Sequence, residues 1–581
     1  MTGPAAPSAD PPPLSDLVMA LLALAVGVIA GGGAIVFRAM IGGFHDLLFL
    51  GELSWRYDAN LHTPPSPWGV LVILVPVVGA VGVAFIVGTF APEAKGHGVP
   101  EVMEAIHYRD GRIRPVVALV KSLASALSIG SGGSVGREGP IAQIGAAFGS
   151  TLGQVIQMPA HQRIVMVSAG AGAGIAATFN APMGGIFFAV ELMLPAMTAR
   201  SIFAVSLATV VATGIGRGAF GALPSFSVPA LTVPGIDHSL STLPRFLICG
   251  LATGLFATLM VHGIYWFEDR FDAMPGTYYT RHVLGMLAVG LIFLAFMSVV
   301  GPLFGQPGHY YVEGVGYATI LDVLRGDLTA PGFLLLLAGA KLLVTGLTLG
   351  SGASGGVFSP SLFMGATLGA SLGAILEALA PGAGLTSVSF AVAGMAGMVA
   401  CTTGAVLTAI VMVFEMTWDY GVILPTILTA VTAYAVRQRL SPASIYTLKL
   451  LRRGHVVPQG LQAWIVGTRR ARDVMSAGFV VRDADQPEDP APPPDPGAVV
   501  VVARGARVAA VAVGDEAASL AYVRVAADDR LAAVLRALGR AEAKVALVMR
   551  SAGSESPRDL MGVITDREIA AQARSTARLM E

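Results

Sequence analysis

The stretch GSGGSVGREGP, from Gly130 to Pro140, sets the terms for the rest of the chain. It places five glycines, two serines and the adjacent charges of Arg137 and Glu138 inside a very apolar sequence. The 581 residues are 54% hydrophobic and 13% charged, with a mean hydropathy of +0.70. Soluble domains average about 25% charged residues, so this composition indicates a protein embedded in a lipid bilayer.

The remaining composition narrows the class of protein. The formal net charge is zero, which gives no reason to expect a nucleic-acid partner. Cys249 and Cys401 lie in apolar segments and fit neither a disulfide framework nor a metal cluster. The first Lys or Arg is Arg38, so the start of the chain lacks the basic region of a signal peptide. We expect residues 1–14 to be a disordered tail before a multi-pass protein of the cell membrane.

The apolar runs predict an all-α polytopic membrane protein. Some runs reach the roughly 20 residues that a bilayer crossing needs, whereas others are short and are cut by Gly or Pro. Short helices with broken backbone are tolerated at membrane depth only inside protein or beside a water-filled cavity. We therefore expect broken, re-entrant helices. The runs begin near Leu17 and continue at Val70–Phe90, Phe246–His262, Val283–Val300, Phe333–Leu349 and Val388–Glu415.

The glycine-rich stretch occurs twice. GSGASGGVFSP, from Gly350 to Pro360, matches the first copy at six of eleven positions, 220 residues later. Lys121 and Lys341 are separated by the same interval, and GHGVP at 96–100 has a weaker echo in GVGY at 314–317. The membrane part is therefore predicted to be a duplication, with halves at about 15–221 and 244–439.

Duplicated membrane halves with broken helices are typical of transporters, which bind their substrate between the repeats. Pro140 and Pro360 suit the first turn of a helix, and the glycines before them let backbone approach a ligand. Free N–H groups and the helix dipole make such an N-terminus a site for anions. The first repeat carries Glu138 at this point, and the second carries Phe358.

Glu138 is then a candidate gate, because a carboxylate can occupy the site that a permeant anion needs. Protonation or rotation of the side chain would free that site. Ionisable residues within a membrane are functional by default. The alternatives are a structural salt bridge from Glu138 to a nearby cation, and a surface loop lined by Arg137.

Three motifs together give a specific resemblance. GREGP at 136–140, GHGVP at 96–100 and GVFSP at 356–360, with FNAP at 179–182 and Tyr446 in SPASIYTL, resemble the CLC family of chloride channels and chloride/proton antiporters. The resemblance covers about residues 15–451. It implies a homodimer of helical subunits, each with two inverted halves and its own anion path.

The same resemblance implies the roles of individual residues. Glu138 matches the external gating glutamate, and Gly356 to Ser359 match a second filter loop whose N–H groups coordinate the anion. A Tyr at a helix end is also common at membrane interfaces, and an apolar Phe is usually core. The expected anion-binding residues are His97, Gly98, Arg137, Gly139, Val357, Phe358 and Tyr446.

Two positions depart from the family pattern. His97 stands where the family has a Ser hydroxyl, and its imidazole can donate a hydrogen bond or fill a structural role. Leu192 stands where antiporters of the family have a proton-carrying glutamate, and Glu191 lies about 100° away on a helix. Glu191 could serve a proton path or anchor the helix end. Leucine favours a passive or weakly coupled chloride channel.

The tail has the composition of a separate small α/β domain. Arginines between 452 and 472 indicate the cytoplasmic side, and residues 452–471 read as a linker. Residues 472–574 resemble a CBS-domain pair with a degenerate first member, and Asp485–Gly497 reads as a disordered loop. Thr565 and Asp566 match the position where such domains hold an adenosine ribose. Asp566 could equally cap the last helix.

Anion transport through a pore in each subunit, gated by Glu138, is the function these features favour. A chloride/proton antiporter or a fluoride-selective relative is the alternative within the class, and a nucleotide-sensing membrane protein the alternative outside it. We find no HExxH motif, Walker loop or nucleophile–base pair, which argues against an enzyme. Chloride or similar anions, protons, the lipid bilayer and a second copy are the expected partners. No cofactor is required, although adenine nucleotide could bind the CBS domain.

Overall fold

The computed structural model describes residues 12–55, 57–226, 236–379, 386–455, 457, 469–484, 499–513, 520–541, 543–551 and 553–569. The chain divides into two compact units, at Asp10–Val457 and Pro458–Glu581. Most of the predicted tail and linker, the loop at 485–497 and the end of the second domain lie outside the described residues. Each unit is considered by itself.

The first unit is built of helices, as the apolar runs predict. Short helices stand between the long ones along the chain, so the chain reverses direction many times within this unit. The helices are α1 (Asp16–His45), α2 (Val75–Phe90), α3 (Val99–Tyr108), α4 (Val116–Gly130), α5 (Glu138–Val155), α6 (Ala160–Phe179), α7 (Pro182–Phe188), α8 (Ala199–Phe220), α9 (Ile236–Ala273), α10 (Tyr278–Ala295), α11 (Gly301–Leu303), α12 (Tyr317–Arg325), α13 (Pro331–Ser351), α14 (Phe358–Leu379), α15 (Ser387–Thr403), α16 (Val406–Thr417), α17 (Ile423–Leu440) and α18 (Ile445–Arg452).

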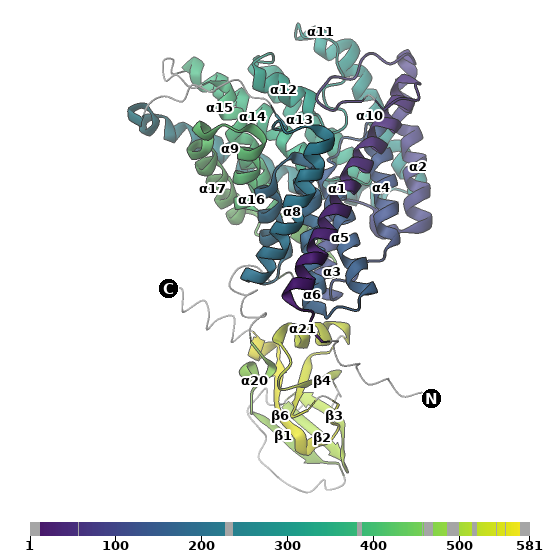
Figure 1. Ribbon diagram of the computed structural model, residues 1–581, viewed down its shortest axis with the longest axis vertical. Coiled ribbons are helices and arrows are strands. Elements are labelled where there is room, and N and C mark those ends of the chain that lie inside the picture. The colour runs from purple at the N-terminus through teal and green to yellow at the C-terminus, as the bar shows by residue number, and fades with distance from the viewer. Residues whose placement is uncertain are drawn as a thin grey trace. The chain divides into compact units, whose positions relative to one another are not determined.

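Within the described residues, eight helical segments are long and apolar enough to cross a membrane. Four further apolar helices have only 10–17 residues, among them α4, α15 and α16. In Figure 1, α9, α15 and α17 gather at one side of this unit and α1, α2 and α4 at the other. The unit therefore combines helices long enough to cross a membrane with shorter apolar ones, which confirms the predicted class of fold.

The two halves repeat the same packing. Helix α1 packs on α8 and α5 on α6, whereas α9 packs on α17 and α14 on α15. Glycines allow the close approach in both halves. A Cβ on Gly145 would lie 2.1 Å from the Gly170 carbonyl oxygen, and one on Gly365 would lie 2.4 Å from that of Gly394. Small residues at equivalent places therefore let equivalent helix pairs touch backbone to backbone.

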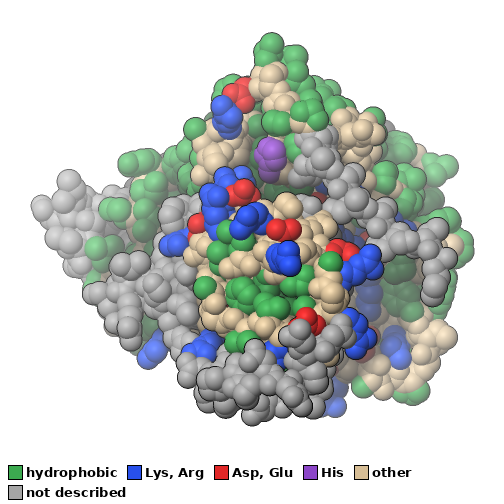
Figure 2. All heavy atoms as spheres, turned by 90° about the horizontal axis from the view of Figure 1, so that it is seen from below, with side chains coloured by type: hydrophobic (Ala, Val, Ile, Leu, Met, Phe, Trp, Pro, Cys, Tyr) green, Lys and Arg blue, Asp and Glu red, His purple; other side chains and the backbone are tan. Residues whose placement is uncertain are grey.

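The second unit contains two small sheets with the same topology. In each, the first strand pairs parallel with the second and the second pairs antiparallel with the third. Figure 2 shows basic and acidic side chains mixed over one face of this unit, around a group of hydrophobic ones. The elements are α20 (Ala471–Val474), β1 (Phe479–Asp483), β2 (Val499–Arg504), β3 (Arg507–Val513), β4 (Tyr522–Ala526), α21 (Leu531–Arg540), β5 (Val545–Met549) and β6 (Leu560–Thr565).

Candidate anion site between the two halves

Two buried lysines hold the loops that lead into the site. Lys121 donates to the carbonyl oxygens of Ala94 and Gly96, at 3.0 and 2.7 Å. Lys341 donates to those of Val312 and Gly314, at 3.0 and 2.8 Å. Each charge is fully buried and is satisfied by the loop before a short helix, α3 in one half and α12 in the other. The lysine pair seen in the sequence thus has one structural task, performed twice.

The two glycine-rich stretches meet directly. Gly136 N–H donates to the Gly356 carbonyl at 2.7 Å, and Gly356 N–H donates back to the Gly136 carbonyl at 2.6 Å. Such a reciprocal antiparallel bond between equivalent residues places a local two-fold relation here. Gly139 lies beside it, where a Cβ would come within 2.2 Å of the His97 carbonyl oxygen. Backbone from α5, α14 and the loop before α3 therefore converges on one point.

Glu138 occupies this point and is only 1% exposed. Its carboxylate accepts hydrogen bonds from the Ser359 hydroxyl at 2.5 Å and from the Ser359 N–H at 3.3 Å. It also accepts one from the Tyr317 hydroxyl at 2.5 Å. These donors lie at the start of α14 and α12 in the second half. The first half therefore supplies an anion, and the second half supplies the groups that bind it.

Arg137 lies beside the carboxylate and faces an open cavity. Its guanidinium stacks over the Tyr317 ring at 5.1 Å, and its Nε has no hydrogen-bond partner in the described part of the chain. A cavity of about 410 Å³ is lined by Arg137, Tyr317, Arg38 and Arg325, with Asp58 as the acidic member. Asp58 lies 3.7 Å from Arg38. The surplus of guanidinium groups makes this cavity attractive to anions.

His97 and Gly98 lie close to Gly139 at the same backbone crossing. A Cβ on Gly98 would approach both the Gly139 carbonyl oxygen and the Gln143 side-chain oxygen at 2.9 Å. His97 is 3% exposed, its Nδ1 is without a partner among the described residues, and its ring packs edge-on against Tyr265 at 6.2 Å. An unsatisfied ring nitrogen is therefore buried next to the site.

The remaining predicted residues lie around this centre. The Phe358 ring packs against Phe179 at 5.6 Å, and Val357 is buried directly before α14. Tyr446 is buried in the first turn of α18. The Tyr265 ring contacts His97, and the Tyr265 hydroxyl donates to the Ile445 carbonyl at 2.5 Å. Tyr265 therefore connects His97 to the start of α18.

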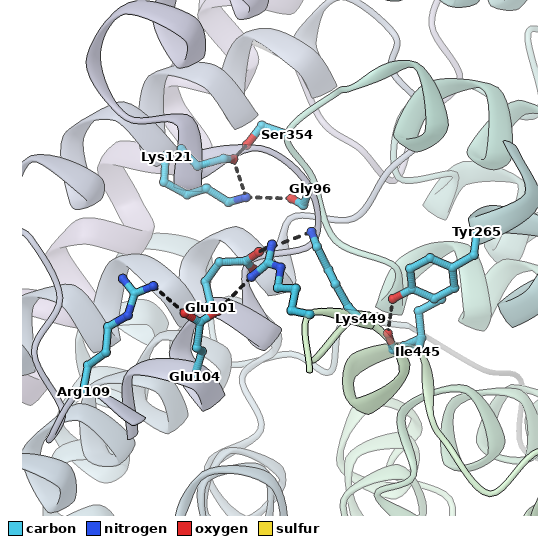
Figure 3. A network of polar contacts seen from close by, with 11 residues as sticks. Gly96, Glu101, Glu104, Arg109, Lys121, Tyr265, Ser354, Ile445 and Lys449 are labelled. Carbon is cyan, nitrogen blue, oxygen red and sulfur yellow. Dashed lines mark hydrogen bonds and ion pairs between the residues drawn. The ribbon is translucent and has the colours of Figure 1, made fainter. Parts of the chain in front are cut away.

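A charged network joins α18 to α3 next to this centre (Figure 3). Glu101 pairs with Lys449 and Arg453, each at 3.2 Å, and Glu104 pairs with Arg453 at 2.8 Å and with Arg109. Glu104 is buried and the Glu101 side chain is only 9% exposed, so their charges depend on these partners. The network fixes α18, and with it Tyr446, against the helix that follows His97 and Gly98.

Glu191 caps a helix of the opposite half. Its carboxylate accepts from Leu407 N–H at 3.2 Å and from the N–H and hydroxyl of Thr408 at 2.9 and 2.8 Å. Glu415 does the same in reverse, accepting from Met183 and Gly184 N–H at the start of α7. These contacts resemble the anchoring alternative, except that the helix end that Glu191 binds is the start of α16 and not the end of its own helix. Leu192 next to it packs against the apolar core.

In the second unit, Thr565 rather than Asp566 holds the cap position. The Thr565 hydroxyl accepts from Arg567 N–H at 3.2 Å, and Glu568 accepts from the Thr565 N–H at 2.9 Å. Together these two bonds cap the start of the helix that follows β6. The cap proposed for Asp566 is therefore one residue off, since Thr565 follows directly from β6 and offers a hydroxyl where the helix begins.

Sequence reasoning gave no role to Tyr317, although GVGY was noted as an echo of GHGVP. In the aligned motifs Tyr317 corresponds to Val99, so only the second half places a hydroxyl there. The departure of one repeat from the other at Tyr317 was the available signal.

Comparison with known proteins identifies the family. The voltage-gated chloride channel family matches residues 79–438. A ClcB-like chloride channel protein of Ralstonia nicotianae is 35% identical over 66% of this chain and 86% of its own. The H⁺/Cl⁻ exchange transporter ClcA of Vibrio parahaemolyticus is 32% identical over 76% and 90%.

Solved structures show the same fold. A slow cyanobacterial Cl⁻/H⁺ antiporter matches with a TM-score of 0.63 and 26% identity, over 75% of this chain and 97% of its own. A eukaryotic CLC transporter, 18% identical, matches with a TM-score of 0.64 over 95% of this chain and 98% of its own. The chain therefore belongs to the voltage-gated chloride channel family, the CLC family, as a multi-pass membrane protein that transports anions.

Proposed function

We propose that this protein exchanges chloride, or a similar small anion, for protons, with Glu138 as the gate of the anion path and as the group that takes up the proton. The observation that carries the proposal is the binding of the Glu138 carboxylate by the Ser359 N–H, the Ser359 hydroxyl and the Tyr317 hydroxyl. Donors of this kind at a helix start suit a halide equally well. A carboxylate bound there blocks the anion, and a protonated one loses its hold on the site.

The path that we propose runs on both sides of Glu138. On one side, the cavity lined by Arg137, Arg38 and Arg325 would concentrate anions next to the gate. On the other, the Gly98 backbone, the Val357 and Phe358 N–H groups and the Tyr446 hydroxyl would hold the anion. His97 would add an imidazole donor. We assign these contacts from the family pattern and from the backbone convergence described above.

Proton coupling is favoured by the relatives, because those named ClcA are H⁺/Cl⁻ exchange transporters and the cyanobacterial neighbour is a Cl⁻/H⁺ antiporter. The sequence favoured a passive channel on the strength of Leu192. The bonds of Glu191 to α16 support that second candidate, because they leave this carboxylate occupied as a cap. The exchanger hypothesis therefore requires a proton path to the inner side that uses neither Glu191 nor Leu192.

Purified protein in liposomes distinguishes these candidates. The vesicles contain high chloride and no pH gradient, and potassium with valinomycin holds the potential near zero. An exchanger draws protons inward as chloride leaves, at a fixed ratio, and Glu138→Gln abolishes the proton signal while chloride still moves. Chloride efflux without proton movement in the unmodified protein makes it a passive channel. Wild-type rate and pH response in Glu138→Gln would remove Glu138 from the gate.

We also propose that the second unit is a CBS pair and that the protein is a homodimer in the membrane. The twofold occurrence of one sheet topology supports the pair. Adenine nucleotide would bind near Thr565 and Asp566, which calorimetric titration of ATP into the full-length protein tests. Mass photometry in detergent or nanodiscs tests the dimer.

A further inference from the structure

We infer that Tyr317 is a positioning residue for Glu138: its hydroxyl holds the carboxylate in the blocking position and thereby sets the pH at which the anion path opens. The inference rests on the proposed gate. Its basis is a set of contacts that converge on one hydroxyl, which lies 2.5 Å from the carboxylate and 2.9 Å from the Ser359 hydroxyl.

The Tyr317 ring is closely packed between aromatic and charged neighbours. It is 1% exposed and packs edge-on against Phe226 at 5.2 Å, with Phe179 at 6.5 Å. The Arg137 guanidinium covers the ring at 5.1 Å. A hydroxyl fixed in this way loses little side-chain freedom when it binds the carboxylate, so its hydrogen bond is pre-organised.

The backbone that carries Tyr317 is equally fixed. Gly316, directly before it, has φ +79° and no space for a side chain, because a Cβ would lie 2.6 Å from the Phe363 ring. Lys341 binds the Gly314 carbonyl at 2.8 Å. Tyr317 then opens helix α12 and also lines the arginine-rich cavity. The Glu138 side chain must therefore break its hydrogen bond with the Tyr317 hydroxyl before it can rotate toward that cavity.

The chemical consequence concerns the charged form of Glu138. The Tyr317 hydroxyl donates to the carboxylate, and a donated hydrogen bond favours the charged form over the protonated one. Removing the donor makes protonation of Glu138 easier. One hydrogen bond to a charged group corresponds to about one pH unit, or about tenfold in the ratio of open to blocked protein at a given pH.

Tyr317→Phe in the full-length protein tests the inference by chloride efflux from liposomes between pH 4.5 and 8. We expect half-maximal flux to move upward by about one pH unit. Tyr311→Phe is the matched control, because it removes a buried hydroxyl that donates to the Pro307 carbonyl nearby, at 2.7 Å. This control should keep the original pH profile.

Combining Tyr317→Phe with Glu138→Gln distinguishes a failure of the role inferred for Tyr317 from a failure of the proposed gate. If Tyr317 acts through Glu138, adding Tyr317→Phe to Glu138→Gln changes flux less than twofold. An unchanged pH profile in Tyr317→Phe, or the same gain in flux in both backgrounds, overturns the role of Tyr317. If Glu138→Gln itself leaves rate and pH response unchanged, the proposed gate is what fails. Ser359→Ala gives a second reading, because it removes the neighbouring donor and should move the profile in the same direction.

Discussion

Glu191 and Glu415 each bind the start of a helix in the opposite half. Replacing them tests whether Glu191 caps a helix or carries protons. Glu191 accepts three hydrogen bonds at the start of α16, and Glu415 accepts two at the start of α7. A lost N-cap costs about 0.5–2 kcal/mol, and a hydrogen bond to a charged group contributes about 1.5–3 kcal/mol. Because Glu191 is partly exposed, we expect Glu191→Ala to destabilise the protein by about 2 kcal/mol. Glu191→Gln keeps one acceptor oxygen and should cost about 1 kcal/mol.

The matched variant is Glu415→Gln, which weakens the equivalent cap in the other half. Stability is measured by unfolding in detergent, and proton and chloride fluxes are measured in the same liposome assay. If Glu191 acts only as a cap, both Gln variants lose similar stability and keep the unmodified ratio of protons to chloride. Loss of proton movement in Glu191→Gln alone, with chloride flux retained, would refute the cap interpretation and make Glu191 part of the proton path.

Three further results are expected. His97→Ser should change the relative permeability of chloride, nitrate and fluoride in liposomes, and unchanged permeability in folded protein would return His97 to a structural role. Gly139→Ala should abolish chloride flux, because its Cβ would lie 2.2 Å from a backbone oxygen, whereas Gly218→Ala, with open space around it, should leave flux unchanged. Burial, followed by the stacked ring of His62, lowers the pKa of His309, and Asp322 partly opposes this. His309 therefore binds a proton more readily when its loop is unfolded than when it is folded. The free energy of unfolding of this loop should fall as the pH drops below about 6.5. The hydrogen-exchange protection factors of residues 308–312 should fall at pH 5.5, and His309→Gln should remove this fall.

The class of fold could be read from the sequence because membrane burial imposes its signal on every residue. Three features are visible in the linear sequence: apolar runs of sufficient length, many glycines with few charged residues, and a repeat at an interval of 220 residues. The site prediction also rested on local sequence, since Glu138 is conspicuous in an apolar, glycine-rich stretch. These features follow from local requirements of backbone and solvent.

Partners across the two halves were decided only in three dimensions. Tyr317 lies 179 residues from Glu138, and Glu191 lies 217 residues from Thr408, so no spacing rule connects them. Both contacts arise because the halves cross at Gly136 and Gly356, where helix starts from one half face side chains from the other. Sequence therefore determined that a carboxylate stands among glycine-rich helix starts. The tertiary structure decided which hydroxyls hold that carboxylate, because a hydrogen bond depends on distance in space and not along the chain.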